Sequence, residues 1–198
     1  MTRSWAGVAM ADRQKIRRGE LLAAGVALLG APEGPAVSVR AVCRATGLTE
    51  RYFYESFADR EQFVLGVYEY VAEQAREMLL AEISVAQSQE ALATAAIRGF
   101  IDLIEEKPDS ARVLLLAPFV EPGLGGRGLE LAPGFTALVE EQLTEVADAD
   151  ERQMVATGVV GALSAIFIEL LDGKLTIGRD RLAGHCYHLL EDANRRRR

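Results

Sequence analysis

The stretch SVRAVCRATGLTERYFYESF, residues 38–57, carries the signals of two short helices joined by a tight turn. Ser38 is a favourable N-cap for a helix that stops at Gly47, because glycine readily adopts the left-handed conformation that turns the chain. Thr49 can cap a second helix that ends near Phe57. Two helices joined by a short turn containing glycine are typical of the helix-turn-helix unit, whose second helix enters the DNA major groove.

Small and apolar residues in this stretch stand where such a unit needs them. Cys43 follows the inward-facing Val42 at a position where two crossing helices approach closely only over a small side chain. Leu48 is expected to fill the angle between the helices. Phe53 and Phe57 are four residues apart, so they share one helical face, and we expect them to pack against the first and fourth helices. The rest of the second helix then lies off the buried face.

Outward from this unit, apolar residues recur at helical spacing, and no alternating strand pattern persists between turn signals. We therefore expect an all-α protein of about nine helices. Residues 121–134 are rich in glycine and proline and are predicted to form a long irregular connection. The expected helices cover about residues 12–29, with Ile16 facing inward, and about 38–47, 49–57, 59–86, 90–106, 109–119, 135–146, 150–171 and 179–194.

Composition bounds the class of protein. A chain of 198 residues with 49% hydrophobic and 26% charged residues has enough apolar sequence to bury a core, which excludes a mainly disordered chain. The apolar run 154–171 contains Glu169 and is interpreted as a buried helix, not a membrane span. The two cysteines are far apart and the N-terminus has no secretion signal, so we expect a cytoplasmic protein without disulfides.

Charge is distributed unevenly along the chain. Residues 1–60 contain nine Lys and Arg against six Asp and Glu, a net charge of +3. Residues 61–198 contain thirteen against twenty-three, a net charge of −10. A basic head on an acidic body indicates a polyanionic partner for the head alone, because a uniformly acidic surface would repel nucleic acid.

Over about residues 14–71 the sequence resembles the tetracycline-repressor (TetR) family of bacterial transcriptional regulators. RRGELLAAGVALLG, residues 17–30, is similar to the arginine-bearing first helix of the family. SVRAVCRATGLTERYFYESFADREQF, residues 38–63, is similar to its central motif, with Tyr54 and Phe57 at the family's tyrosine and phenylalanine. The resemblance implies a three-helix, helix-turn-helix DNA-binding head over residues 1–60. It also implies a helical domain for ligand binding and dimerisation over residues 61–198.

Some positions of the motif match the family and others depart from it. Arg60 and Glu61 stand where the family usually has a Lys-Glu pair. Tyr52 occupies a position that is more often small, and Glu50 brings a negative charge to the helix expected to face the groove. Tyr52 can pack against a thymine methyl group, and Glu50 can accept a hydrogen bond from cytosine N4.

The resemblance implies which side chains meet double-stranded DNA. Tyr54 is expected to donate its hydroxyl to a phosphate, and Ser38 and Arg40 would meet phosphates at the positive end of their helix. The N-terminal basic residues Arg13, Lys15, Arg17 and Arg18 would add electrostatic attraction. The complete set of expected DNA contacts is Ser38, Arg40, Thr49, Glu50, Arg51, Tyr52, Tyr54 and Arg60.

The resemblance further implies a homodimer held by the last two long helices. GVVGALSAIF, residues 158–167, places small side chains at three- and four-residue spacing, which lets helices approach closely. Packing of the same stripe within one chain is the alternative. A dimer would present two recognition helices to successive major grooves of a palindromic operator. The expected interface residues are Gly158, Gly161, Ala162, Ala165 and Cys186.

A small-molecule effector of unknown identity is expected among the helices that follow the fourth. By favouring a different separation of the two heads, such a ligand would release a repressor from DNA. Most of the candidate residues also suit an ordinary apolar core. They are Tyr68, Met78, Phe100, Leu103, Leu115, Phe119, Phe135, Met154 and Phe167.

Other sequence patterns are not expected to form a binding or catalytic site. His185, Cys186 and His188 offer too few ligands for zinc, and no second cluster exists, so no metal or cofactor is expected. The glycines of residues 123–128 lack the strand and lysine of a phosphate loop. The Arg195–Arg198 tail is expected to be disordered by default, with contact to DNA as the alternative. The protein is therefore not expected to be an enzyme. The alternatives are an all-helical enzyme or small-molecule carrier with a vestigial head, and a structural dimer whose head binds protein.

Overall fold

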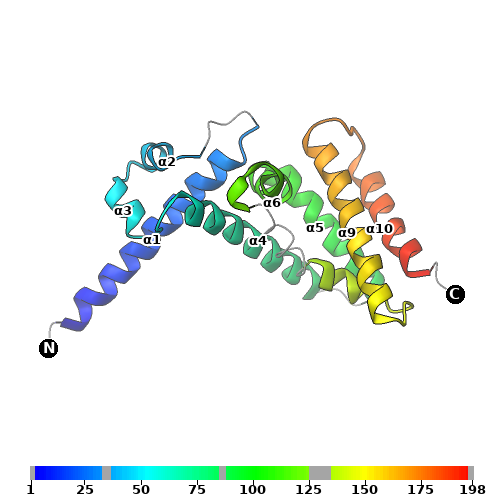
Figure 1. Cartoon of the computed structure of the whole chain (residues 1–198). Coiled ribbons are helices and arrows are strands. Elements are labelled where there is room, and N and C mark those ends of the chain that lie inside the picture. Colours follow the sequence, from blue (N-terminus) through cyan, green and yellow to red (C-terminus); the bar gives the residue numbers. More distant parts are fainter. Residues whose placement is uncertain (1–2, 33–36, 85–87, 125–134, 196–198) are drawn as a thin grey trace.

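The computed structural model describes residues 3–32, 37–84, 88–124 and 135–195, and every regular element among them is helical (Figure 1). The predicted all-α class is confirmed. Residues 135–140 are also helical. The labelled elements are α1 (Arg3–Leu29), α2 (Val39–Thr46), α3 (Glu50–Tyr54), α4 (Arg60–Ser84), α5 (Gln89–Glu106), α6 (Pro108–Leu115), α7 (Ala117–Val120), the 3-10 helix η1 (Pro122–Leu124), α9 (Ala149–Leu171) and α10 (Arg179–Arg195).

Several helices begin where a side chain caps them. Ser38 and Ser88 each accept a hydrogen bond from the third residue that follows, and Asp59 accepts one from the Gln62 backbone N–H at 2.8 Å. These bonds satisfy backbone donors that have no partner inside the helix. Thr49 precedes α3 as expected, but its side chain makes no cap hydrogen bond, so the predicted cap interaction is wrong.

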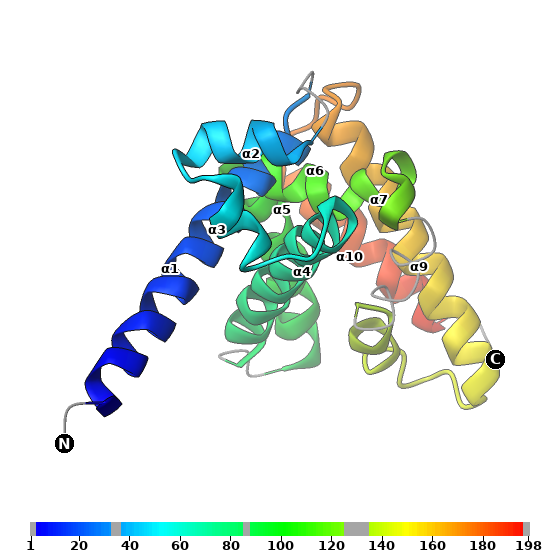
Figure 2. The ribbon, with the colours of Figure 1, turned by 60° about the vertical axis from the view of Figure 1, so that its left-hand side comes forward.

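Several helix boundaries differ from the prediction. Helix α3 ends at Tyr54 and not near Phe57, and the helix expected over 135–146 is helical over 135–140. The first helix begins at Arg3, nine residues before the expected start, and its N-terminal end projects beyond α3 (Figures 1 and 2). The single helix expected over 109–119 is instead α6 and α7, interrupted at Leu116. Pro118 lacks the backbone N–H that a continuous helix needs at this point, which accounts for the break.

The long helix α4 connects the two ends of the molecule. Helices α1, α2 and α3 gather at its N-terminal end, whereas α9 and α10 lie side by side at the opposite end, beyond α5 (Figure 1). In Figure 2 the same arrangement is seen with α2 and α3 in front. The elements that hold the helix-turn-helix motif are therefore well separated from the last two helices.

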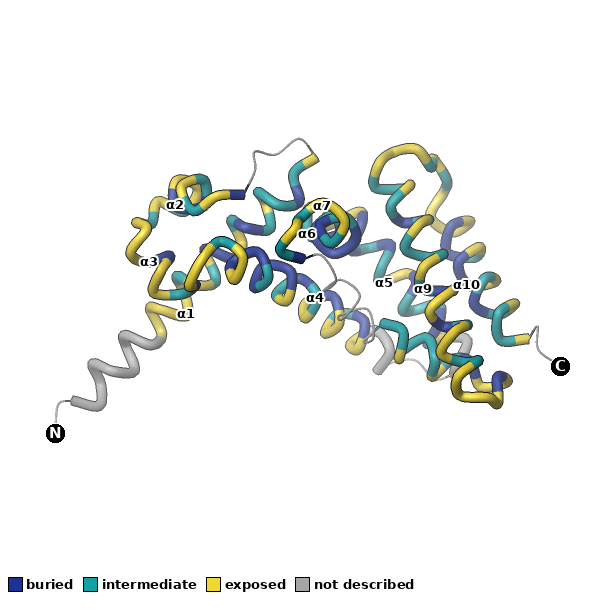
Figure 3. Tube along the Cα trace, in the orientation of Figure 1, coloured by how far each residue is buried: buried dark blue, intermediate teal, exposed yellow. Residues whose placement is uncertain are grey.

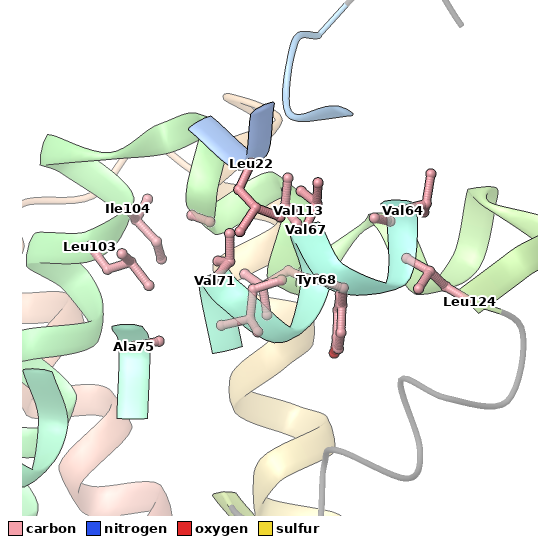
Figure 4. Close-up of a cluster of buried hydrophobic side chains, with 14 of the residues drawn as sticks. Leu22, Val64, Val67, Tyr68, Val71, Ala75, Leu103, Ile104, Val113 and Leu124 are labelled. Carbon is pink, nitrogen blue, oxygen red and sulfur yellow. The ribbon is translucent and has the colours of Figure 1, made fainter. Parts of the chain in front are cut away.

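One hydrophobic cluster runs from the head into the body. It includes Leu21, Val42 and Phe53 from the first three helices, and it continues through α4 to Ile101 and Val113. Figure 3 shows the buried stretches of the chain, and Figure 4 shows part of the cluster, with Val113 labelled beside side chains of α4. A smaller cluster around Leu143 lies farther along the body. The division at residue 60 stays a prediction.

Glycines allow α1 to pack closely at two points. A Cβ atom on Gly25 would lie 2.7 Å from Cζ of Phe63, so α1 and α4 cross at a distance that only glycine permits. A Cβ atom on Gly30 would lie 2.6 Å from the Cα of Asp109, in the first turn of α6. Ile16, by contrast, is 61% exposed, so its predicted inward orientation is wrong. It lies between Gln14 and Arg17, which contact the α3 segment, so its exposure means that it stands on another face of α1.

Candidate nucleic-acid interface

The turn between α2 and α3 is fixed by local hydrogen bonds. Gly47 has a φ of 70° in the left-handed region, as predicted for the turn glycine. The Thr46 hydroxyl donates to the Val42 carbonyl at 3.0 Å and accepts from the Leu48 backbone N–H at 3.3 Å. This hydroxyl ties the end of α2 to the start of the next segment. Sequence reasoning missed Thr46, although a threonine directly before a turn glycine could have signalled the role.

Helix α3 is anchored by the aromatic side chains on its inner face. Phe53 is fully buried, with its ring centroid 5.2 Å from Phe63 and 5.7 Å from Phe57. The Tyr54 ring meets the edge of Phe53 at 5.4 Å, while 55% of the tyrosine remains exposed. The predicted packing of both phenylalanines is confirmed, and their burial turns the opposite face of α3 toward solvent.

The solvent face of α3 carries the charged residues predicted for it. The side chain of Arg51 is 84% exposed and that of Glu50 is 55% exposed. Thr49 is exposed at the start of the helix. Arg40 of α2 belongs to the same surface, because its Nε lies 3.9 Å from Glu50 Oε1. The structure thus brings α2 and α3 residues together on one accessible face.

The side of α3 nearest α1 is held by that helix. The Arg17 guanidinium lies 4.3 Å from the Tyr52 ring centroid, an arrangement that gains cation–π attraction. Arg17 also lies 3.7 Å from Glu55, whose backbone carbonyl accepts a hydrogen bond from Gln14 at 3.1 Å. Tyr52 is therefore half-buried and Arg17 has partners within the protein. Sequence reasoning missed the positioning contacts of Gln14 and Glu55, because they join α1 to the end of α3.

The N-terminal basic residues surround this face unequally. Arg13 and Lys15 are exposed on α1. Arg18 has its guanidinium 4.7 Å from the Phe57 ring centroid, so it covers the aromatic core of the head. Ser38 is exposed, and its hydroxyl accepts the Ala41 backbone N–H at 3.2 Å, which makes it a helix cap.

Arg60 does not share the α3 surface. Its Nε donates to the Val37 carbonyl at 2.6 Å, and one terminal nitrogen contacts both carboxylate oxygens of Glu121 at 2.9 and 3.0 Å. The guanidinium therefore has partners within the protein, although the Arg60 side chain is 36% exposed. The expected contact of Arg60 with DNA stays a prediction, and these partners compete with it.

The outer face of α9 differs from the rest of the surface. This helix is long and apolar enough to cross a membrane by length and composition alone, which is weak evidence for a span, yet only 17% of its most apolar window is buried. The predicted buried helix over 154–171 is therefore wrong for the single chain. Gly158, Gly161 and Ala165 are exposed, and Ala162 is half-buried. Cys186 is fully buried within its own chain, so its expected place in an interface between chains is wrong.

The residues expected to line a ligand site divide into two groups. Tyr68, Leu103, Leu115 and Phe167 are buried, and Met78, Phe100 and Phe135 pack partly buried against the same cluster. Phe100 stacks on Phe167 at 5.1 Å and meets Phe135 edge-on at 6.0 Å. Phe119 is 80% exposed and Met154 is 67% exposed, so neither lines the interior of the chain. For Phe119 the cause is the interruption at Leu116, which turns α7 away from the core.

Burial governs the titration of three groups. It raises the pKa of the Tyr68 hydroxyl, which therefore stays a hydrogen-bond donor at neutral pH. Burial, with a smaller contribution from the Glu50 carboxylate, raises the pKa of the Cys43 thiol. Burial raises the pKa of Cys186 to about 11. Both thiols are consequently protonated near neutral pH and are poor nucleophiles.

The histidines of residues 185–188 do not converge on a metal position with the neighbouring cysteine. His185 and His188 are exposed, whereas Cys186 is buried. Within the part of the chain that the structure describes, no group of three His, Cys, Asp or Glu side chains could hold a metal ion. Arg195 pairs with Glu191 at 2.6 Å, while residues 196–198 and the glycines at 125–128 lie outside the described residues.

Comparison with known proteins gives the fold. No family model and no curated protein matches the sequence. A Pseudomonas aeruginosa PAO1 protein described as a transcriptional regulator superposes with a TM-score of 0.75 at 18% identity, covering 93% of this chain and 95% of that chain. A TetR-like transcriptional regulator from Rhodococcus sp. RHA1 gives 0.71 at 17% identity, with 89% and 94% covered.

A third solved structure was determined with a ligand. It is the transcriptional regulator FadR from Bacillus subtilis in complex with stearoyl-CoA, with a TM-score of 0.71 at 14% identity, covering 90% of this chain and 98% of that chain. At these identities the similarity establishes the fold. The chain has the fold of TetR-type regulators over most of its length, as the sequence resemblance predicted.

Proposed function

We propose that the protein is a homodimeric, DNA-binding transcriptional repressor of the TetR type, released from a palindromic operator by a small-molecule ligand. One observation carries the proposal: a five-residue helix stands on a buried phenylalanine core and exposes Arg51 and Tyr54 from a helix-turn-helix motif. A helix held in this way can enter the major groove without rearranging the core. The fold shared with known regulators supports the same conclusion.

Each exposed side chain has a chemical role in the proposed complex. Arg51 can donate two hydrogen bonds to guanine O6 and N7, and Glu50 can accept one from cytosine N4. Tyr54 can donate its hydroxyl to a phosphate, because its ring is fixed against Phe53 while its outer part is exposed. Arg40 and Thr49 would meet the backbone on either side of the turn. Half-buried Tyr52 would offer only its ring edge to a base.

The distribution of charge favours one orientation on DNA. The first 60 residues have a net charge of +3 and the remainder has −10. A duplex would therefore be attracted to the head and repelled from the body. Because operator DNA is found with the nucleoid, this function places the protein in the cytoplasm and requires no catalytic step.

The exposed apolar face of α9 supports the proposed dimer. Gly158 and Gly161 have no atoms within 4 Å of the position a Cβ would take, so the small stripe is not used for packing within the chain. Exposing an apolar helix face to water is unfavourable, and a second copy of the same face would cover it. The dimer would place two α3 helices on the same side of a duplex.

The body supports a ligand with a substantial apolar part. Among the described residues no polar or charged side chain is fully buried, and the interior is formed by aliphatic and phenylalanine side chains. Tyr68 is the candidate with a polar group near this interior. The stearoyl-CoA bound to the similar Bacillus subtilis regulator is a molecule with such an apolar chain. Binding would shift the population of head separations away from the one that fits the operator.

The proposal is tested by selecting duplexes from fragmented genomic DNA of the source organism on the purified protein. Selected duplexes should share a palindromic sequence, and affinity should fall steeply with salt as phosphate contacts release counterions. The proposed function fails if no duplex is enriched, or if the affinity for enriched duplexes is independent of salt.

A further inference from the structure

Arg60 connects two regions of the molecule that are far apart in sequence. It is the first residue of α4, and its guanidinium has partners on two sides. On the head side, Nε donates to the carbonyl of Val37 at 2.6 Å. On the body side, a terminal nitrogen contacts both oxygens of Glu121 at 2.9 and 3.0 Å.

Each partner of Arg60 stands at the end of a helix. Val37 is buried and directly precedes Ser38, the N-cap of α2, so holding its carbonyl fixes the point where the motif begins. Glu121 is the C-cap of α7, with its backbone N–H bonded to the Ala117 carbonyl. The Arg60 guanidinium thus links the start of α2 to the end of α7.

The Glu121 carboxylate is more sheltered than those of Glu50 and Glu55 in the head, whereas the Arg60 side chain is 36% exposed. The Glu121 side chain is 13% exposed, so its carboxylate is largely withdrawn from water and depends on the guanidinium for compensation. The position for a Cβ on Gly123 lies 3.7 Å from the Glu61 side chain, so the segment after Glu121 lies beside the first turn of α4. By comparison, Arg51 pairs with Glu55 at 3.2 Å and Arg40 lies 3.9 Å from Glu50, but both arginine side chains are more than four-fifths exposed, so water screens these pairs and a DNA partner can replace them.

We propose that the Arg60–Glu121 pair fastens the helix-turn-helix head to the body and fixes the orientation of α2, and that Arg60 acts through this pair without contacting phosphate. Arginine suits the task because its planar guanidinium can donate from Nε and a terminal nitrogen in two directions at once, which lysine cannot do. Movement of α7 relative to α4 would break the pair and release the start of α2. The operator-binding part of this inference rests on the proposed function, whereas the fastening of the head does not.

Two variants distinguish a fastening role from a phosphate contact. Arg60→Lys keeps the positive charge that a phosphate would need but removes the two-sided bond. Glu121→Gln removes the charge that holds Arg60 and leaves the arginine in place. Glu73→Gln is the matched control, because Glu73 makes a two-point pair with Arg76 at 2.7 and 3.0 Å within α4 alone.

The first measurement needs no DNA. Nitroxide labels on the exposed positions Ala45→Cys in α2 and Arg181→Cys in α10 report the distance between head and body by pulsed electron resonance. The native Cys43 and Cys186 are buried and react slowly, and labelled chain is diluted in unlabelled protein so that only pairs within one chain contribute. We expect a single narrow distribution in the parent and in Glu73→Gln, and a broadened one in Arg60→Lys and Glu121→Gln.

The second measurement is operator affinity at several salt concentrations. Arg60→Lys and Glu121→Gln should each weaken binding about tenfold, and the double variant should be no weaker than either single one, because coupled residues are not additive. The dependence on salt should keep the same slope, since no phosphate contact is lost.

The proposal is overturned if Glu121→Gln leaves both the distance distribution and the affinity unchanged. It is also overturned if Arg60→Lys binds normally while Arg60→Gln lowers the salt slope by about one, the result expected of a phosphate contact. If the parent binds no DNA at all, the proposed function fails, and the distance distributions alone decide whether the pair fastens the head.

Discussion

Two surfaces of the molecule are exposed for opposite chemical reasons. The outer face of α3 presents Arg51, Glu50 and the hydroxyl side of Tyr54, groups that water solvates well. The outer face of α9 presents Gly158, Gly161 and Ala165, which water solvates poorly. Both faces are equally surface by their exposure. Covering the apolar α9 face lowers the free energy of the protein, whereas the polar α3 face is stable in contact with water.

The comparison indicates what each face can bind. A polar, aromatic face on a short rigid helix suits a hydrated, charged partner such as a DNA groove, where hydrogen bonds replace those to water. A flat stripe of small residues suits a second helix at close range. The two faces therefore require different substitutions to disable them, and the following predictions run from the largest expected effect to the smallest.

Gly161→Glu should prevent the proposed contact between chains through α9 and leave the outer surface of α3 unchanged. The added Cβ meets no atom within 4 Å, and glutamate is a better helix former than glycine by about 1 kcal/mol, so the single chain should not be destabilised. A charge on the covered face should dissociate the dimer, and operator affinity should fall about 100-fold as the two heads bind independently.

The oligomeric state of Gly161→Glu is measured by analytical ultracentrifugation. Gln74→Glu, which adds the same charge to an exposed position on α4, should remain dimeric. A dimeric Gly161→Glu variant would show that the apolar face of α9 is not the contact between chains.

Gly25→Ala should damage the core beneath the α3 face. A Cβ at this position would lie 2.7 Å from Cζ of Phe63, and overpacking of this kind costs about 1–3 kcal/mol of unfolding free energy. Gly19→Ala is the matched variant in the same helix, where a Cβ meets no atom within 4 Å. It should instead stabilise the protein by about 0.5–1 kcal/mol.

Urea denaturation of both variants gives the two free energies. Equal stabilisation by Gly25→Ala and Gly19→Ala would contradict the close crossing of α1 and α4.

Tyr54→Phe should weaken the α3 face alone. The ring contact with Phe53 is kept, so folding should not change, while the hydroxyl that would donate to a phosphate is lost. A hydrogen bond to a charged group is worth about 1.5 kcal/mol, so operator affinity should fall about tenfold at matched salt. Tyr70→Phe on α4 is the control, and fluorescence anisotropy is the measurement. Normal affinity in Tyr54→Phe would remove this phosphate contact from the proposed complex.

Cys186 should make stability fall with rising pH between about 9 and 11. Burial raises the pKa of this thiol to about 11 in the folded chain, whereas the unfolded chain loses the proton near the ordinary thiol pKa of 9.0. Between these values the folded state binds more protons, so each pH unit should lower the unfolding free energy by about 1.4 kcal/mol.

The measurement is urea denaturation at pH 8, 9 and 10 on the parent and on Cys186→Ala, comparing slopes because the substitution also leaves a small cavity. If the unfolding free energy changes equally with pH in the parent and in Cys186→Ala, the Cys186 thiol is in contact with solvent. Cys186 would then belong to the surface on the α9 side.

The sequence predicts those features of the fold that depend on residues close together in the chain. The Ser38 cap, the left-handed Gly47 and the inward Phe53 each follow from signals within a few positions, and all three are confirmed. The outward position of Tyr54 follows from the same helical geometry, and the structure agrees.

Contacts between distant segments could not be predicted in this way. Arg60 meets Glu121 across 61 positions, and no local pattern marks either one for the other. Phe119 looked like interior because it is aromatic at helical spacing, but Pro118 breaks the helix and leaves it exposed. Helical periodicity places Cys186 on one face of α10 without saying whether the chain itself or another chain covers that face, and Cys186 is buried within its own chain.

The hydrophobic cluster that passes without interruption from Leu21 and Phe53 through Phe63 and Val67 limits how modular the molecule can be. A fragment ending at residue 60 would lack the α4 side chains against which its own phenylalanines pack, so it should not fold by itself. Grafting this head onto a different helical body would therefore have to carry the first three turns of α4 with it.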